Sequence, residues 1–135
     1  MSPLQELGYT CRIDDVSCDE FFIEKVDGKD FVVVVAYTLR NNDILLTEGR
    51  DFAPGNFLEQ IKLDFEQLLE EGATRRRMMS ISAQDRISGT LAMVRVWDEF
   101  LRCAKSHPGV IFMRKDDITK YALKNPSTVR ESETI

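Results

Sequence analysis

Two short polar segments of this chain carry the side chains with the most chemical potential. Residues 37–43 read YTLRNND, and residues 84–88 read QDRIS. Each is expected to follow a buried strand, and ligands of parallel α/β proteins bind at the carboxyl ends of strands. Carboxylates partly shielded from water can act as general bases, and Asp43 and Asp85 are the candidates. Arg86 could bind a carboxylate or stabilise an enolate-like charge.

Other polar side chains of these segments could orient a polar ligand. They are Tyr37, Asn41, Asn42, Gln84 and Ser88. A structural explanation stands beside the functional one, because an Asn-Asn-Asp sequence holds its own turn through bonds from side chain to backbone. In the same way, Arg86 could simply pair with a neighbouring carboxylate, and Asp85 could be a solvated loop acid. The two segments define a candidate site and leave both explanations open.

Strands alternating with amphipathic helices must position these segments. Residues 31–37 read FVVVVAY, a run without polar alternation that favours a strand buried on both faces. Further strands are expected at residues 9–13, 77–82 and 110–113, with Asp27-Gly28 as a turn signal and residues 83–89 as a loop. This alternation predicts an α/β fold with mainly parallel strands.

Three helices are predicted between these strands. The first opens at Pro54-Gly55-Asn56, with Asn56 as N-cap, and ends at Gly72 as a C-cap glycine. The second spans residues 90–106, and the last begins at Asp116 or Asp117 and ends near Leu123. The expected buried face of the second helix comprises Leu91, Val94, Trp97, Leu101 and Ala104, widened by Met93 and Phe100.

Composition narrows the class of protein. The 135 residues carry a net charge of −5, which argues against a nucleic-acid partner. We expect one domain over residues 1–124 and a loose polar tail over residues 125–135. The sequence contains no run of apolar residues long enough for a membrane span and no basic, apolar leader. Three cysteines without zinc spacing favour free thiols in the cytoplasm.

Several segments together resemble the polysaccharide deacetylase family, in its allantoinase-like and peptidoglycan-deacetylase-like branch. Residues 4–9 read LQELGY and residues 36–43 read AYTLRNND, similar to the family's LxELGY and PYTLDNND. The third signal is EGAT at residues 71–74 with MMSISAQDRISG at 78–89 and FLRCAKSHPGV at 100–110. The resemblance covers residues 4–123 and implies the C-terminal half of a deformed β/α barrel.

The resemblance also implies a chemistry that this chain lacks the residues to perform. Family members hold a divalent metal, usually zinc, with an aspartate and a His-x-x-x-His pair, and these lie in the other half of the barrel. The family's MMSISLHPRISG has an active-site histidine, whereas Ala83, Gln84 and Asp85 replace its Leu-His-Pro. Glutamine cannot titrate near neutrality. The single histidine, His107, matches a position remote from the pocket. We therefore expect no metal, no cofactor and no deacetylation by this chain alone.

Three functions follow from this combination. The first is a repurposed, metal-independent enzyme that isomerises, cyclises or eliminates from a small organic molecule, with Asp85 and Asp43 as bases and Arg86, Gln84 and Tyr37 as stabilisers. The second is a non-catalytic binding or interaction protein, or a pseudoenzyme fragment. The third is an amide hydrolase completed by another chain. Because half a barrel has open sheet edges, we also expect a homodimer that covers the open edge.

Overall fold

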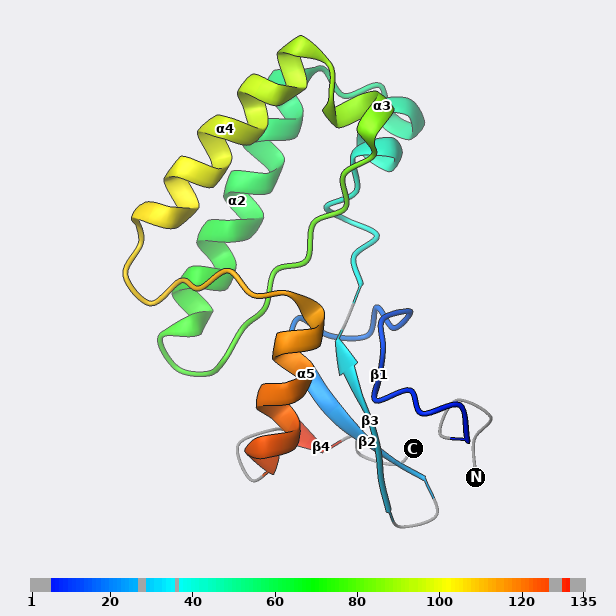
Figure 1. Ribbon diagram of the computed structural model, residues 1–135. Helices are drawn as coiled ribbons and strands as arrows, with labels where there is room; N and C mark the ends of the chain where they lie inside the picture. The colour runs from blue at the N-terminus through cyan, green and yellow to red at the C-terminus, as the bar shows by residue number, and fades with distance from the viewer. Residues whose placement is uncertain (1–5, 27–28, 36, 127–129, 132–135) are drawn as a thin grey trace. The chain divides into compact units, whose positions relative to one another are not determined.

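The computed structural model describes residues 6–26, 29–35, 37–126 and 130–131 (Figure 1). The chain divides into two compact units. The first consists of Met1–Tyr37 with Phe112–Ile135, and the second of Thr38–Ile111. A domain boundary at residue 124 stays a prediction.

The first unit is a small sheet with one helix on it. Its strands are β1 (Cys11–Arg12), β2 (Phe21–Val26), β3 (Lys29–Val35) and β4 (Arg130–Glu131), in the order β1-β3-β2-β4. Helix α5 (Lys115–Lys124) packs against β2 and β3 and buries Ile118 and Ala122. The ring of Phe21 meets the ring of Tyr121 edge to face, with the centroids 6.2 Å apart. Val33 and Val35 are fully buried.

The prediction of a mainly parallel sheet is not confirmed in this unit, whose sheet is mixed. β1 pairs with β3 and β2 pairs with β4 in parallel, but the longest ladder joins β2 and β3 antiparallel, with Phe22 opposite Val34. No strand was expected between residues 13 and 31, where the structure has β2. The predicted turn residues Asp27 and Gly28 lie outside the described residues. A hairpin is the connection that a two-residue Asp-Gly loop favours, because both residues tolerate positive φ.

The second unit is built on two packed helices. Helix α2 spans Pro54–Gly72 and helix α4 spans Leu91–Ser106, preceded by a π-helix, η1 (Ile44–Glu48), and a short α3 (Asp85–Ser88). Phe65 on α2 meets Phe100 on α4 edge to face, with ring centroids 5.8 Å apart. The buried core residues are Leu46, Phe57, Ile61, Phe65, Met93, Val96, Phe100 and Ala104.

Both long helices were predicted, but their details differ. The N-cap of α2 is Ala53, and Pro54 occupies the first turn, where its missing N–H costs nothing. Gly72 is the last helical residue, not the cap, which is Ala73. On α4 the buried stripe is rotated from the expected one, so that Leu91 is 95% exposed and Val94 53% exposed. Both stripes of α4 are apolar, and contact with α2 selects the one that is buried.

Two expected strands, residues 77–82 and 110–113, do not form in the described chain. Residues 76–81 have no regular secondary structure, and the only sheet-like pairing next to them is an isolated parallel bridge between Asn42 and Ser82. Ile111 is 74% exposed and Phe112 is 54% exposed. A strand exists only through a ladder with a neighbour. The apolar run of β3 is paired with β1 and β2 and offers these segments no ladder.

Candidate functional site around Asp43

The buried carboxylate of Asp43 is the centre of the candidate site. Asp43 is completely buried and caps η1. Its Oδ1 accepts the backbone N–H of Ile44 at 2.8 Å. Its Oδ2 accepts the backbone N–H of Gln84 at 2.7 Å and the hydroxyl of Ser88 at 2.5 Å. Three donors therefore supply hydrogen bonds to both oxygens of this buried carboxylate.

Backbone hydrogen bonds hold the two loops together beside this carboxylate. The N–H of Asp43 donates to the carbonyl of Ser82 at 3.2 Å, and the N–H of Ser82 donates to the carbonyl of Asn41 at 2.9 Å. The predicted meeting of the two polar segments is thus present in the second unit: residues 41–43 lie against residues 82–88.

Gly89 closes the second loop. Its N–H donates to the carbonyl of Asp85 at 2.9 Å. A Cβ on Gly89 would lie 2.4 Å from that carbonyl oxygen, which is closer than real Cβ atoms approach. Only glycine therefore fits this ending of α3, and α3 in turn holds Ser88 against Asp43.

Asn41 and Asn42 have largely structural surroundings. Both are 6% exposed. The hydroxyl of Thr38 accepts the backbone N–H of Asn41 at 2.9 Å, and Oδ1 of Asn42 accepts that of Ile44 at 3.2 Å. Oδ1 of Asn41 is buried and has no hydrogen-bond partner within the described part of the chain. A buried acceptor without a donor is uncommon in native proteins, and this one belongs to the site.

Three predicted residues of the second loop face water. Gln84, Asp85 and Arg86 are exposed. Oδ1 of Asp85 accepts the backbone N–H of Arg86 at 2.7 Å. Carboxylates of loop acids commonly accept such local bonds. The Asp85 carboxylate therefore combines a fixed backbone with access to solvent.

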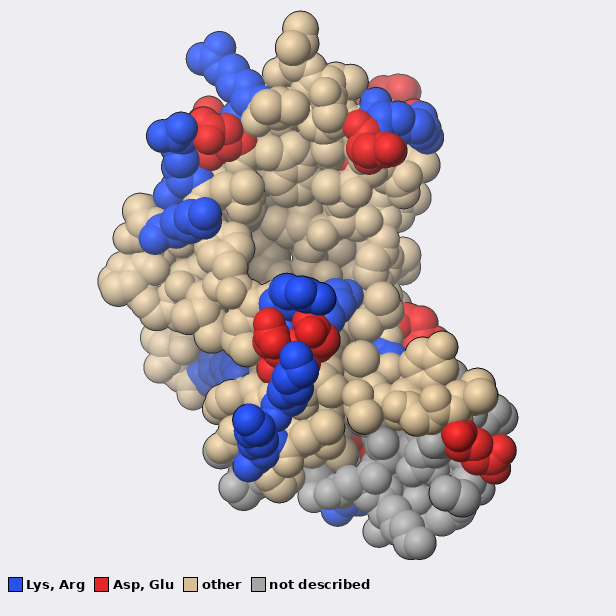
Figure 2. Space-filling view, in the orientation of Figure 1, with Lys and Arg blue, Asp and Glu red and all other residues tan. Residues whose placement is uncertain are grey.

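Arg86 forms a two-point ion pair with Glu48 of η1. Its Nη2 lies 2.8 Å from one carboxylate oxygen of Glu48, and its Nη1 contacts the other. This partner lowers the pKa of Glu48 and raises the pKa of Arg86. Figure 2 shows basic and acidic side chains gathered together over α3 and η1. Sequence analysis offered pairing with a neighbouring carboxylate as the structural explanation for Arg86. In this structure Arg86 does form such a pair, with Glu48.

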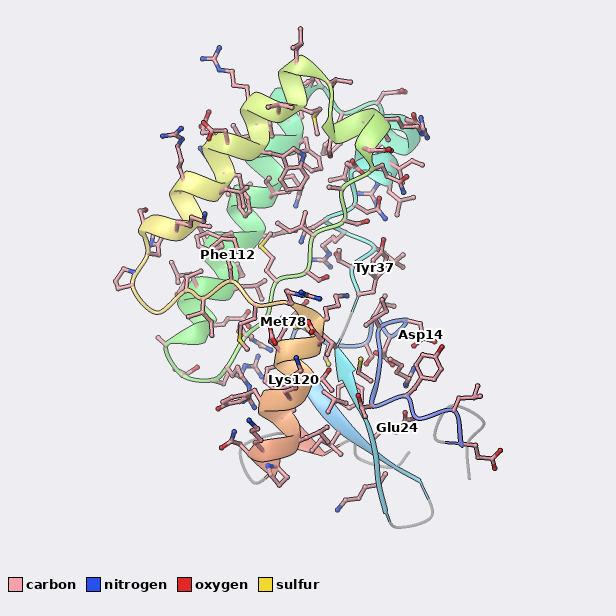
Figure 3. All side chains as sticks on the ribbon, in the orientation of Figure 1. Asp14, Glu24, Tyr37, Met78, Phe112 and Lys120 are labelled. Atoms are coloured by element: carbon pink, nitrogen blue, oxygen red, sulfur yellow. The ribbon has the colours of Figure 1, made fainter. Side chains whose placement is uncertain are left out.

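Tyr37 belongs to the first unit, apart from the other predicted ligand-binding residues. It follows β3 (Figure 3), and its backbone N–H donates to the carbonyl of Asp15 at 2.7 Å. The ammonium of Lys115 lies 5.4 Å from the centre of its ring. A ligand-binding function for Tyr37, as for Asn41, Asn42, Gln84 and Ser88, stays a prediction. So do the catalytic functions of Asp43, Asp85 and Arg86.

A metal ion does not fit the side chains of the site. Among the described residues, no three histidine, cysteine, aspartate or glutamate side chains lie close enough together to hold one. Both oxygens of Asp43 accept hydrogen bonds, and three-ligand zinc sites need coordinating atoms from several such side chains.

Of the chain as described, no helix has the length and apolarity to cross a membrane. Cys11, Cys18 and Cys103 are free and partly exposed.

Two solved structures resemble this chain over most of its length. The crystal structure of a probable polysaccharide deacetylase from Pseudomonas aeruginosa PAO1 matches with a TM-score of 0.82 and 29% identity, over 90% of this chain and 41% of that one. A crystal structure of Puue allantoinase matches with a TM-score of 0.82 and 29% identity, over 92% of this chain and 44% of that one. No protein-family model and no curated protein matches the sequence.

These matches confirm the resemblance that the sequence motifs predicted. The chain has a polysaccharide deacetylase-like and allantoinase-like structure and spans less than half the length of either solved protein. A partial α/β fold is therefore correct, while the described residues form an open mixed sheet and no barrel. Sequence reasoning missed one contributor to the site, Glu48, which pairs with Arg86. Glu48 lies 38 residues from Arg86, and no periodicity links them.

Proposed function

We propose that this chain binds a small polar organic molecule at the Asp43 site. There it moves a proton from one atom of that molecule to another, without a metal. The hydrogen-bonded carboxylate of Asp43 is the observation that supports this most. It fixes the backbone of Gln84 and the hydroxyl of Ser88 at distances of 2.7 and 2.5 Å. Groups that are positioned before the substrate arrives lower the barrier of a proton transfer, because no reorganisation is needed.

Each residue then has a distinct function. Asp85 is the general base, because of the two candidate carboxylates it is the one that a substrate can reach, and it belongs to a short helix anchored through Ser88. Asp43 is a positioning residue, because three donors occupy its carboxylate. Arg86, when it exchanges Glu48 for a substrate carboxylate, holds that carboxylate at two points. Removal of a proton next to a carbonyl and its return at another atom amounts to an isomerisation.

The first experiment is a ligand screen with matched variants. Thermal shifts of the full chain would be measured against small oxo acids, beginning with pyruvate, for wild type, Arg86→Ala and Asp98→Asn. Asp98 is an exposed acid of the same unit on α4, where it pairs with Arg102 at 2.8 Å. We expect stabilisation that Arg86→Ala abolishes and Asp98→Asn preserves. Equal shifts in all three proteins would contradict the assignment of Arg86.

A non-catalytic binding protein is the second candidate, and one observation favours it. Arg86 is engaged by Glu48, and the Asp85 carboxylate is exposed to competing water. Binding that Arg86→Ala removes, without any turnover in wild type, would select this candidate.

An amide hydrolase completed by another chain is the third candidate. Its support is that the chain spans 41% and 44% of the two solved proteins. Amide hydrolysis that appears only on mixing with a second polypeptide carrying metal ligands would establish it. Absence of activity in the mixture, with the complex formed, would remove it.

We also propose a second copy of this chain as the partner, docked on α4. Leu91, Val94 and Leu101 lie on one exposed stripe of that helix, at 95%, 53% and 37% exposure. Across a twofold axis near the middle of α4, two antiparallel copies would cover this apolar stripe with the same stripe of the partner.

A further inference from the structure

Glu48 occupies the guanidinium that a ligand carboxylate would need. Nη2 of Arg86 donates to one carboxylate oxygen of Glu48 at 2.8 Å, and Nη1 donates to the other. The side chain of Arg86 is 58% exposed, and that of Glu48 is 49% exposed. Acidic and basic side chains meet at the surface over α3 and η1 (Figure 2). The free chain therefore already shows what Arg86 binds at two points, namely a carboxylate within reach of water.

Both members of this pair belong to elements that the Asp43 carboxylate anchors. Arg86 lies on α3, where the hydroxyl of Ser88 donates to Oδ2 of Asp43 at 2.5 Å. Glu48 is the last residue of η1, and Oδ1 of Asp43 accepts the N–H of Ile44 at the start of that π-helix. Turns of π-helix are rare and are frequent at functional sites. Because both backbones are held, only the two side chains need to move when the pair opens.

Three acids attract Arg86, and Glu48 is the one among them that contacts the guanidinium. The charges of Asp43 and Asp85 act on Arg86 more weakly than the charge of Glu48 does. Asp43 is buried, and both of its oxygens accept other hydrogen bonds. Oδ1 of Asp85 accepts the backbone N–H of Arg86 at 2.7 Å. The half-exposed carboxylate of Glu48 can instead turn into water, where a surface carboxylate is well solvated.

We infer that Glu48 is a built-in competitor of the ligand, which covers Arg86 in the free chain and gives way when a small carboxylate binds. The exchange replaces one two-point carboxylate contact with another, so Arg86 keeps the same number of charge-assisted hydrogen bonds. The affinity of the site is then reduced in proportion to the fraction of molecules in which Arg86 is uncovered. An uncharged ligand offers no such replacement and leaves the pair closed.

This inference rests on the proposed function, because it concerns the same ligand at the same site. It adds a residue that determines specificity, since only a ligand with a carboxylate can take the place of Glu48. Ion pairs on protein surfaces are weak, so the competition should lower the affinity by about twofold to fivefold. Glu48 therefore tunes the affinity of the site for carboxylates and does not close it.

An NMR titration of the full chain with pyruvate measures this competition. Wild type, Glu48→Gln and Asp51→Asn would be titrated at the same pH and ionic strength. Asp51 is an exposed acid three residues after Glu48, and its backbone φ of 53° is one that asparagine also adopts. Asp51→Asn thus removes the same charge from the same segment without removing a contact to Arg86. We expect Glu48→Gln to bind pyruvate about twofold to fivefold more tightly than wild type, and Asp51→Asn to bind it as wild type does.

Pyruvamide, which has no carboxylate, is the control on the side of the ligand. Its affinity should be the same for wild type and Glu48→Gln, because it does not compete with Glu48 for Arg86. Equal affinities of wild type and Glu48→Gln for pyruvate, or an equal gain in Asp51→Asn, would overturn the inference and leave the proposed binding in place. Absence of pyruvate binding in all three proteins would contradict the proposed function itself, and the inference with it.

Discussion

The backbone N–H of Gln84 donates to Oδ2 of Asp43 at 2.7 Å, although the two residues are 41 positions apart. This hydrogen bond joins the two polar loops that carry most of the chain's candidate chemistry. Because Ser88 donates to the same oxygen, a single buried carboxylate sets the position of α3. The two loops are therefore held together before any ligand binds.

Loss of the Asp43 carboxylate should destabilise the second unit. Asp43→Ala leaves the N–H of Gln84 and the hydroxyl of Ser88, both partly buried, without their acceptor, and the loss should be about 1–3 kcal/mol. Urea denaturation should show the loss as a lower midpoint. Asp85→Ala, at an exposed position, should change stability by no more than about 0.5 kcal/mol. Similar losses in both variants would show that Asp43 has no special structural function.

Two glycine substitutions should have opposite effects. Gly89→Ala places a Cβ 2.4 Å from the carbonyl oxygen of Asp85, and the resulting shift of backbone should cost about 1–3 kcal/mol. Gly72→Ala meets no atom within 4 Å at the end of α2, and should stabilise by up to about 1 kcal/mol. Thermal unfolding of the two variants measures both. Stabilisation by Gly89→Ala would contradict the close approach.

Neighbouring residues on α4 should differ sharply in their contribution to stability. Phe100 is 2% exposed and contacts Phe65, so Phe100→Ala should cost about 3–5 kcal/mol. Leu101 is 37% exposed, and Leu101→Ala should cost far less. Chemical denaturation distinguishes them. A larger loss for Leu101 would mean that the buried stripe is the one expected from sequence.

The Arg86–Glu48 ion pair should make stability depend on acid pH. Arg86 lowers the pKa of Glu48 in the folded chain below its ordinary 4.5, so the unfolded chain binds the proton more readily. The contribution is therefore present above pH 4.5 and is lost as the pH falls through the lowered folded value. The stability difference between wild type and Glu48→Gln should shrink over that window and in high salt. A difference that grows on acidification would contradict the pairing.

Self-association through α4 should respond to a single charge. Val94→Glu introduces a carboxylate into the exposed stripe, and sedimentation should show a protein of half the wild-type mass. Leu63→Glu, at an exposed position on α2, serves as the control and should leave the dimer intact. A wild-type monomer at all concentrations would remove the proposed partner.

Local signals in the sequence were sufficient to predict the long helices. Phe57, Ile61 and Phe65 follow the period of an amphipathic helix and are the buried residues of α2, because that period is encoded locally. On α4 two apolar stripes compete, and only contact with α2 decides between them. β2 was missed because Phe21, Phe22 and Ile23 are followed by charged residues, while its pairing with β3 is a tertiary contact.

The candidate site was predicted in part for the same reason. Polar loops after expected strands indicated that residues 41–43 and 84–88 would meet, and they do. Burial of Asp43 and pairing of Arg86 with Glu48 depend on residues far apart in the chain. The residue types alone indicate neither the burial of Asp43 nor the ion pair between Arg86 and Glu48. The strand expected before Gln84 does not form, because residues 77–82 have no neighbouring strand to pair with. The sequence of a single segment does not show whether such a neighbour exists.

The most direct test of the proposed function is exchange of substrate protons in D₂O. Pyruvate, whose methyl protons are adjacent to a carbonyl, would be followed by proton NMR with wild type, Asp85→Asn and Asp98→Asn. We expect loss of the methyl signal with wild type and Asp98→Asn, and a signal that persists with Asp85→Asn. Exchange that is equally fast with Asp85→Asn, or exchange with wild type no faster than in buffer, would contradict it.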